Sequence, residues 1–338
     1  MLKVQLPYGV QELDSQVCVD LGPPKRIRCF VRACNRMLRP PTTRGGGEVC
    51  PEHGIRCHSS GTYSYADVRR NLIADADLFA TRVVGHPFKH ETHRFNQENS
   101  EDALTWNVFR SLQNAGCLQK VANLVTGLDT NEEPQLFLWG LRSTGDTFEP
   151  WDLLIAARQR FENNLPVKRP LTEPDIALYL PGRYLLLIEA KFTSANPFYA
   201  NGARKDATSL TKDELIDIYW DQALTTLDRS KARAAERVHY QLWRNLVFAE
   251  WMAGIRKDAT PAFLGSLTRR GQEQESCREF GLLLNEGYRN RFNHISWEGL
   301  LATCLGGSPS LETLAAYMKS KTTKLKAAFD LPRGSVMA

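Results

Sequence analysis

Residues 173 to 192, EPDIALYLPGRYLLLIEAKF, form two short apolar runs on either side of a Pro-Gly pair. Apolar runs of this length are typical of β-strands, and Pro and Gly supply the backbone angles that a tight turn needs. The segment therefore predicts a hairpin, with strands over 175–180 and 184–191 joined by residues 181–183. Because a hairpin fixes which residues face each other, this one stretch strongly constrains both the fold and the position of any site built on it.

Three charged residues, Asp175, Glu189 and Lys191, stand within this apolar hairpin. Successive side chains of a strand point to opposite faces, so Glu189 and Lys191 share one face and Ala190 takes the other. A three-residue loop places Asp175 opposite Glu189, with Cβ atoms about 5 Å apart. A two-residue loop would pair Asp175 with Ile188 and turn it to the other face. We predict the three-residue register, which brings the three charges together.

Two carboxylates held this close repel each other and shift their pKa values unless a cation lies between them. Hard divalent ions such as Mg²⁺ favour such oxygen ligands. A lysine beside the ion can stabilise developing negative charge or orient a water, and metal-assisted attack on a phosphodiester needs these groups. The alternative is a turn residue at Asp175, with Glu189 and Lys191 on a solvated strand face.

Pro174-Asp175, followed fourteen residues after the Asp by Glu189-Ala190-Lys191, resembles the PD-(D/E)xK motif of the restriction-endonuclease-like nuclease superfamily. The resemblance implies an α/β fold with a mixed central sheet flanked by helices, built as helix, three-strand meander, helix and strand. About sixty residues before the hairpin include LFLWGLRS, which predicts an extra strand, and PWDLLIAARQRFENN, which predicts a helix. Either the sheet is extended there or an insertion decorates it.

The sequence after the hairpin fits the same core. Residues 211 to 254 predict one or two long amphipathic helices, and RFNHISW followed by EGLLATCL predicts a further strand and helix. By resemblance, Gln222 of the long helical segment is a candidate for contact with phosphate. The polar stretch before that segment carries Arg204 and Lys205, which could lie near phosphates or on a mobile loop.

The superfamily usually takes a further acid from its first helix. NSEDALTWNVFRSLQNAG predicts that helix, with Asn99 or Ser100 as N-cap and Gly116 as the C-terminal signal. By resemblance Glu101 would be the first-helix acid, and Glu98 is its close competitor. The alternative is that both acids only complement the helix dipole.

The resemblance also implies a mechanism. Asp175, Glu189 and the main-chain carbonyl of Ala190 would bind Mg²⁺ or Mn²⁺, with Glu101 touching the ion directly or through water. Lys191 would orient the attacking water or stabilise the pentavalent phosphate. A bound metal acidifies water and neutralises developing charge, which contributes several kcal/mol to such reactions. The chain is therefore expected to be a metal-dependent endonuclease.

A cysteine-rich segment lies near the amino end, within residues 25–60. Its cysteines form two pairs, separated by four and by six residues, and a Pro- and Gly-rich loop joins the pairs. Such paired sulfur ligands resemble a treble-clef or ribbon-like structural zinc site. The favoured ligands are Cys29, Cys34, Cys50 and Cys57, with His53 as the first substitute and His58 as a further neighbour. Disulfides and unligated thiols are the alternatives, and disulfides are disfavoured because the amino-terminal sequence shows no secretory signal.

Charge supports a nucleic-acid partner locally. The chain carries a net charge of +5, and residues 21–60 alone carry +6, from eight basic residues against Glu48 and Glu52. The guanidinium fork matches phosphates and guanine edges, although a solvated basic surface would look the same. The basic residues are Lys25, Arg26, Arg28, Arg32, Arg36, Arg39, Arg44 and Arg56.

DNA is the favoured substrate over RNA, and restriction or phage defence is the role that the resemblance suggests. A homodimer or a partner ATPase is compatible with such an enzyme. The competing hypothesis is a zinc-dependent nucleic-acid-binding protein whose nuclease-like domain is a non-catalytic scaffold, which predicts salt-dependent binding without cleavage.

The length and hydropathy of the chain predict its number of domains and its relation to membranes. At 338 residues with 42% hydrophobic content, the chain can bury a sizeable core in two or three domains. We predict an N-terminal region over 1–90, a nuclease core with insertions over 91–310, and a C-terminal helix and tail over 311–338. No apolar run approaches the roughly 20 residues that cross a bilayer, so a cytoplasmic protein without membrane contact is expected.

Overall fold

Two units make up the chain, and each is assembled from separate segments of the sequence. The first unit comprises Met1–Gly85, Glu91–Ala115 and Leu305–Ala338, and the second comprises His86–His90 and Gly116–Cys304. The three domains predicted from the sequence are continuous ranges, whereas each of these units combines separate segments. The predicted domain boundaries remain a prediction. The computed structural model describes residues 6–14, 19–20, 25–42, 46–89, 94–144, 147–163, 171–200, 210–255, 260–304 and 310–331.

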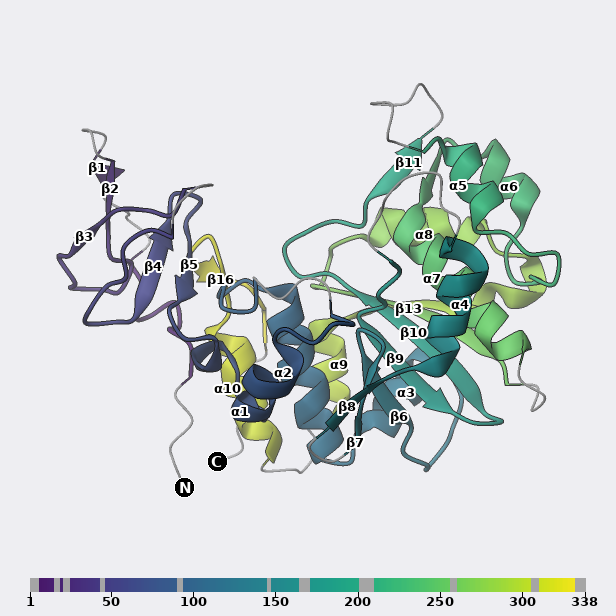
Figure 1. The fold of residues 1–338 in the computed structure, drawn as a ribbon, viewed down its shortest axis with the longest axis horizontal. Helices are drawn as coiled ribbons and strands as arrows, with labels where there is room; N and C mark the ends of the chain where they lie inside the picture. The colour runs from purple at the N-terminus through teal and green to yellow at the C-terminus, as the bar shows by residue number, and fades with distance from the viewer. Residues whose placement is uncertain are drawn as a thin grey trace. The chain divides into compact units, whose positions relative to one another are not determined.

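A seven-stranded mixed sheet forms the centre of the second unit (Figure 1). Its order is β14-β13-β10-β9-β6-β7-β8. Strand β13 pairs parallel with β10 and with β14, and the other neighbours pair antiparallel. The predicted α/β class with a mixed sheet is therefore confirmed. The strands are β6 (Gln135–Leu138), β7 (Leu141–Thr144), β8 (Thr147–Pro150), β9 (Ile176–Leu180), β10 (Tyr184–Ala190), β13 (Ala262–Thr268) and β14 (Phe292–Ser296).

Helices cover both faces of this sheet. Helix α7 (Tyr240–Gly254) packs on β10 and β13, where Leu185 and Leu187 join its core. Helix α3 (Leu118–Thr126) packs against β13 and β14, and a Cβ at Gly265 would lie 3.1 Å from Val125 of that helix. Because strand side chains alternate, the face that receives Leu185 and Leu187 also receives the side chain of residue 189.

The remaining elements of the second unit are helical, apart from one small sheet. The helices are α4 (Asp152–Glu162), α5 (Lys212–Ile218), α6 (Arg229–Ala234), α8 (Gln274–Leu282), the 3₁₀ helix η3 (Glu286–Arg291) and α9 (Trp297–Cys304). The two-stranded sheet pairs β11 (Phe198–Ala200) with β12 (Arg237–His239). Strand β14 and helix α9 occupy the positions predicted from RFNHISW and EGLLATCL.

The first unit contains short strands and a helical pair. Helix α2 (Glu101–Asn114) packs against α10 (Ser310–Ser320), so the beginning and the end of the chain share this unit. The small strands are β1 (Val19–Asp20), β2 (Arg26–Arg28), β3 (Met37–Leu38), β4 (Ile55–His58), β5 (Thr62–Tyr65), β15 (Thr322–Thr323) and β16 (Lys326–Ala327). The other turns are the 3₁₀ helix η1 (Val68–Asn71), α1 (Ala76–Leu78) and the π-helical turn η2 (Phe79–Val83).

The ends of α2 agree with the sequence prediction. Ser100 has an extended backbone, and its hydroxyl accepts a hydrogen bond from the Ala103 amide at 3.1 Å, as an N-cap does. Gly116 follows the helix with a φ of +62°, the left-handed conformation that glycine adopts without strain.

Two element predictions are wrong. The segment LFLWGLRS forms two strands, β6 and β7, because Trp139 and Gly140 take positive φ angles and turn the chain. Residues 211–254 form α5, α6, β12 and α7 in place of one or two long helices. Asp221 and Asp228 hydrogen-bond the main chain just ahead of them, and such local bonds compete with a continuous helix.

No described helix is both long enough and apolar enough to span a membrane.

Candidate active site and Cys-His cluster

The β9–β10 hairpin has the predicted three-residue register. Leu180 pairs with Tyr184 and Ile176 pairs with Ile188, so the loop is 181–183. The same register, extended by one residue, sets Asp175 opposite Glu189. The two-residue alternative, in which Asp175 faces Ile188, is excluded.

Asp175 lies against the main chain of β10. Its Oδ2 accepts a hydrogen bond from the Ala190 amide at 2.8 Å, and its carbonyl accepts one from the Trp139 amide at 3.2 Å. These two contacts fix the residue between β6 and the end of β10. The hairpin therefore positions the carboxylate of Asp175 beside the Glu189-Ala190-Lys191 segment.

Glu189 and Lys191 form a buried ion pair. The Lys191 Nζ lies 2.6 Å from Glu189 Oε1 and also donates to the Ala190 carbonyl at 3.1 Å. The side chains of Lys191 and Glu189 are only 6% and 4% exposed. Main-chain bonds hold Lys191 on both sides: its amide donates to Leu267 of β13, and its carbonyl accepts from the Trp297 indole at 3.0 Å. The alternative of a solvated strand face is therefore wrong.

Asn245 is a member of this site that the sequence did not reveal. It is fully buried on α7, and its Nδ2 donates to Glu189 Oε2 at 2.7 Å. Its Oδ1 is buried without a partner among the described residues. The contact joins residues 56 positions apart. A polar residue at an inward position of an apolar helix was the only sequence signal for it.

These groups fit a divalent cation. The Lys191 ammonium lies, as a cation would, between Glu189 Oε1 and the Ala190 carbonyl, two of the oxygens that the resemblance predicts as metal ligands. Asp175 approaches the same residue, Ala190, from β9, and oxygen atoms of this kind are what Mg²⁺ and Mn²⁺ prefer.

The other predicted acids lie in the first unit. Glu101 opens α2 and remains a predicted ligand. Glu98 is 1% exposed, and its Oε1 accepts from the Thr62 hydroxyl at 3.0 Å. Gln222 lies exposed in a turn between α5 and α6, not on a helix, so the helix-based reason for choosing it is wrong. Arg204 and Lys205 lie outside the described residues.

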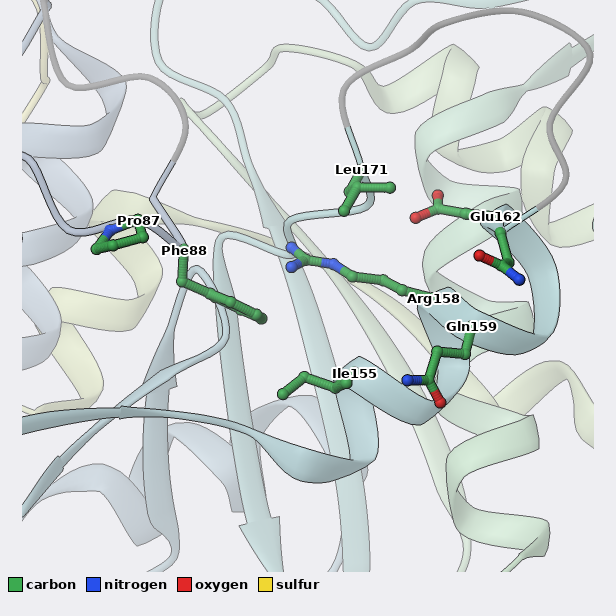
Figure 2. A pocket seen from close by; sticks show the side chains of 8 residues that line it. Pro87, Phe88, Ile155, Arg158, Gln159, Glu162 and Leu171 are labelled. Carbon is green, nitrogen blue, oxygen red and sulfur yellow. The ribbon is translucent and has the colours of Figure 1, made fainter.

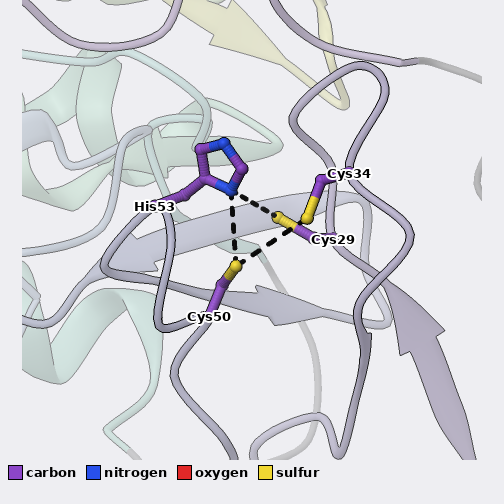
Figure 3. A group of neighbouring side chains, drawn as sticks. All are labelled: Cys29, Cys34, Cys50 and His53. Atoms are coloured by element: carbon purple, nitrogen blue, oxygen red, sulfur yellow. Dashed lines mark hydrogen bonds between the residues drawn. The ribbon is translucent and has the colours of Figure 1, made fainter.

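Four potential zinc ligands cluster in the first unit, as Figure 3 shows. The ligand atoms of Cys29, Cys34, Cys50 and His53 all lie within 4.8 Å of one another. The His53 Nδ1 is 3.3 Å from Cys50 Sγ and 3.7 Å from Cys29 Sγ, and Cys34 Sγ is 3.9 Å from Cys50 Sγ. This Cys₃His set is compatible with a tetrahedral zinc module.

Two tight turns bring these ligands together. Cys29 follows β2, and its amide donates to the Arg36 carbonyl, which closes the first turn around Cys34. In the second turn the Cys50 amide donates to the Ile55 carbonyl, and Gly54 donates back to the Cys50 carbonyl. Gly54 has a φ of +62°, so the CPEHG sequence forms a tight turn. In this turn two residues separate Cys50 from His53.

Of the four favoured ligands, Cys57 lies outside this cluster, and His53, the first substitute, lies within it. Cys57 lies on β4 next to Cys29, and its Sγ accepts a hydrogen bond from the Phe30 amide at 3.4 Å. Hydrogen bonding to Cys57 and burial raise the pKa of Cys29, and burial raises the pKa of Cys34 to about 12. Without a cation these thiols stay protonated, whereas zinc binds thiolates.

The basic segment is partly neutralised by nearby acids. Arg26 lies 3.6 Å from Glu48, Arg36 lies 2.8 Å from Glu52, and Arg28 pairs with Asp14. Arg44 lies outside the described residues. Glu48 and Glu52 are already subtracted in the net charge of +6, so only the pairing of Arg28 with Asp14 lowers the local charge further. Contact of this segment with nucleic acid stays a prediction.

The mixed sheet, the helices on both its faces and the Asp-Glu-Lys set at the end of β10 define a restriction-endonuclease-like scaffold. The chain belongs to the family described as Restriction Endonuclease associating with ARP, whose model matches residues 55–321. The predicted resemblance is thereby confirmed. No curated protein and no solved structure matches the chain. The matched range begins within β4, so the four ligands of the Cys₃His cluster precede it.

Proposed function

We propose that the chain is a metal-dependent endonuclease that hydrolyses phosphodiester bonds, with DNA favoured over RNA. The observation that carries the proposal is the meeting of Asp175, Glu189 and Lys191 at the end of one hairpin. Family membership supports it, because the same scaffold is the one that the PD-(D/E)xK resemblance implied. Restriction or phage defence is the role we propose, and a dimer or a partner ATPase would be compatible with it.

Each residue has a part in the proposed mechanism. Asp175, Glu189 and the Ala190 carbonyl, all of the second unit, would hold Mg²⁺ or Mn²⁺. Such an ion, when bound, acidifies a water and neutralises charge on the phosphate. Lys191 orients the attacking water or stabilises the charge that develops on the phosphate oxygens. Asn245 holds the Glu189 carboxylate in place from α7.

The test is cleavage of labelled single- and double-stranded DNA and RNA by the full chain, with Mg²⁺, Mn²⁺ or EDTA. We expect metal-dependent cutting by the wild type and its loss in Asp175→Ala and Lys191→Ala, while both variants still bind nucleic acid. Arg183→Ala is the matched control, because this basic residue is exposed in the loop of the same hairpin. If Lys191→Ala cleaved at the wild-type rate, the proposed catalytic role of Lys191 would be wrong.

A second candidate is a zinc-dependent nucleic-acid-binding protein with a non-catalytic scaffold. The closed Lys191–Glu189 ion pair favours it, because the lysine already neutralises one of the carboxylates proposed to bind metal. This protein would bind nucleic acid in a salt-dependent way and cut none with any metal. Under either function the Cys₃His cluster is proposed to hold one structural zinc ion.

A further inference from the structure

A pocket of about 480 Å³ lies in the second unit, beside α4 (Figure 2). Its walls include the apolar side chains of Phe88, Ile155 and Leu171. Arg158, Gln159 and Glu162, at helical spacing on α4, supply its polar groups. Pockets of this size and mixed lining are typical of sites for small molecules or single residues of a polymer.

Arg158 is the chemically unusual member of the pocket. The residue is only 6% exposed, and its guanidinium carbon lies 4.2 Å from the centre of the Phe88 ring. Its Nε donates to the Thr172 carbonyl at 2.7 Å, but its Nη2 is buried without a partner among the described residues. Burial lowers the pKa of Arg158, so its charge is incompletely compensated. In Figure 2 the guanidinium reaches between Phe88 and Leu171.

The neighbouring carboxylate does not supply the missing acceptor. Glu162 accepts hydrogen bonds from the amide and the hydroxyl of Thr172 and, at 2.9 Å, from the Tyr219 hydroxyl. Its oxygens are therefore already engaged. Since no described residue supplies an acceptor for the Arg158 Nη2, a bound molecule could supply it.

A nucleobase matches this combination of groups. Apolar walls cover ring faces, and an arginine fork pairs with the O6 and N7 acceptors of guanine. Arg158 is buried inside a pocket, so a base can reach it only after leaving the base stack, as in enzymes that flip a nucleotide. We propose that this pocket receives a guanine base of the substrate strand, turned out of the stack, with Arg158 donating to its acceptor edge. The inference rests on the proposed nuclease function and deepens it.

The chain connects this pocket directly to the candidate active site. Thr172 is held by Arg158 at its carbonyl and by Glu162 at its amide. Glu173 is the next residue and pairs with the buried Lys89, and Asp175 comes two residues later. A base bound to Arg158 would therefore lie next to the short segment that positions Asp175. We expect cleavage at a fixed number of nucleotides from the recognised guanine.

The test is equilibrium binding of short labelled single-stranded DNAs that differ at one position: guanine, 7-deazaguanine, adenine or an abasic site. Full-length Lys191→Ala serves as the background, because it should not cut the probes. We expect the guanine probe to bind about tenfold or more tightly than the others, as a bidentate arginine contact confers. The discrimination should vanish in Arg158→Gln and in Leu171→Trp.

The two variants answer different questions. Arg158→Gln removes the donor and could also perturb the fold, whereas Leu171 is 37% exposed, so a tryptophan there fills the pocket without disturbing the core. Arg160→Gln is the matched control, because Arg160 lies on α4 in an exposed pair with Asp221 at 2.8 Å. Its discrimination should equal that of the background protein.

Two outcomes overturn the inference: equal affinity for the guanine and abasic probes, or full discrimination in Leu171→Trp. Either one leaves the nuclease proposal intact if the wild type still cuts in a Lys191-dependent way. Conversely, guanine discrimination that depends on Arg158 and is blocked by Leu171→Trp would support the pocket even if the wild type cuts nothing.

Discussion

At the scale of single residues, the candidate site consists of groups that neutralise one another. Lys191 neutralises Glu189, and the Ala190 amide donates to Asp175. The sequence identified these residues because a hairpin register is a local property that a short loop fixes. It could not identify Asn245, because that contact depends on how α7 packs across β10, and no local pattern encodes such packing.

Asn245 should matter for catalysis through Glu189. Asn245→Ala leaves Glu189 Oε2 without its donor, and loss of such a supporting partner typically costs about 10–100-fold in metal affinity or activity. We expect the cleavage rate to fall in that range and the half-saturating Mg²⁺ concentration to rise. Rates measured across a Mg²⁺ titration test this.

The matched control is Asn293→Ala. Asn293 also makes a long-range hydrogen bond, but to the main chain of Val125 and away from the carboxylates. A change that is only structural would lower thermal stability in both variants and leave the Mg²⁺ dependence unchanged. If the cleavage rate of Asn245→Ala depended on the Mg²⁺ concentration as that of the wild type does, Asn245 would have no positioning role.

At the scale of elements, local patterns predicted several helices and strands correctly but missed some local turns and the long-range packing. The hairpin, α2, β14 and α9 were predicted because turn residues, caps and apolar periodicity mark them. The prediction for segment 211–254 failed because two aspartates engage the main chain inside an otherwise helical pattern. Helices α2 and α10 pack together although they lie about 200 positions apart, and no local sequence pattern predicts such a contact.

A buried pair ties the ends of these two helices together. Lys321, just after α10, donates to Asn71 Oδ1 at 2.9 Å and to the carbonyl of Glu98, just before α2. Both charged residues are 1% exposed. Burial raises the pKa of Glu98 to about 7 and lowers the pKa of Lys321 to about 8.

The sign of the pH dependence can be derived from these shifts. Between pH 4.5 and about 7 the folded Glu98 keeps a proton that the unfolded chain releases, so its contribution to stability is lost as pH rises. The Lys321 contribution is present above pH 10.5 and is lost as pH falls through about 8. The pair therefore stabilises the unit least near neutral pH.

We expect Glu98→Gln to remove the change in stability with pH that occurs below about pH 7. From pH 5 to 7 the free energy of unfolding of the wild type should fall relative to the variant, by at most about 1.4 kcal/mol per pH unit. Urea unfolding of the full chain at several pH values measures this, with the exposed Glu286→Gln as the control. Parallel pH profiles for wild type and Glu98→Gln would contradict the prediction.

At the scale of the whole molecule, the two proposed metal sites serve different units. The Cys₃His cluster belongs to the first unit, and the carboxylate and lysine set belongs to the second. Four of the twelve residues in the small core around the cluster are cysteines, and its strands are two to four residues long. We expect so small a core to take much of its stability from a bound metal, whereas the sheet of the second unit has a large apolar core of its own.

Zinc removal should therefore loosen the first unit and leave the second intact. We expect one zinc ion per chain in the purified protein, retained in Cys57→Ala and lost in His53→Ala and Cys50→Ala, as measured by elemental analysis. Hydrogen exchange followed by mass spectrometry should then show faster exchange in β2 and β4 of the zinc-free variants, with β10 and β13 as protected as in the wild type. Zinc lost in Cys57→Ala but kept in His53→Ala would restore the four-cysteine set. Equal loss of protection in β10 would mean that the two units do not unfold separately.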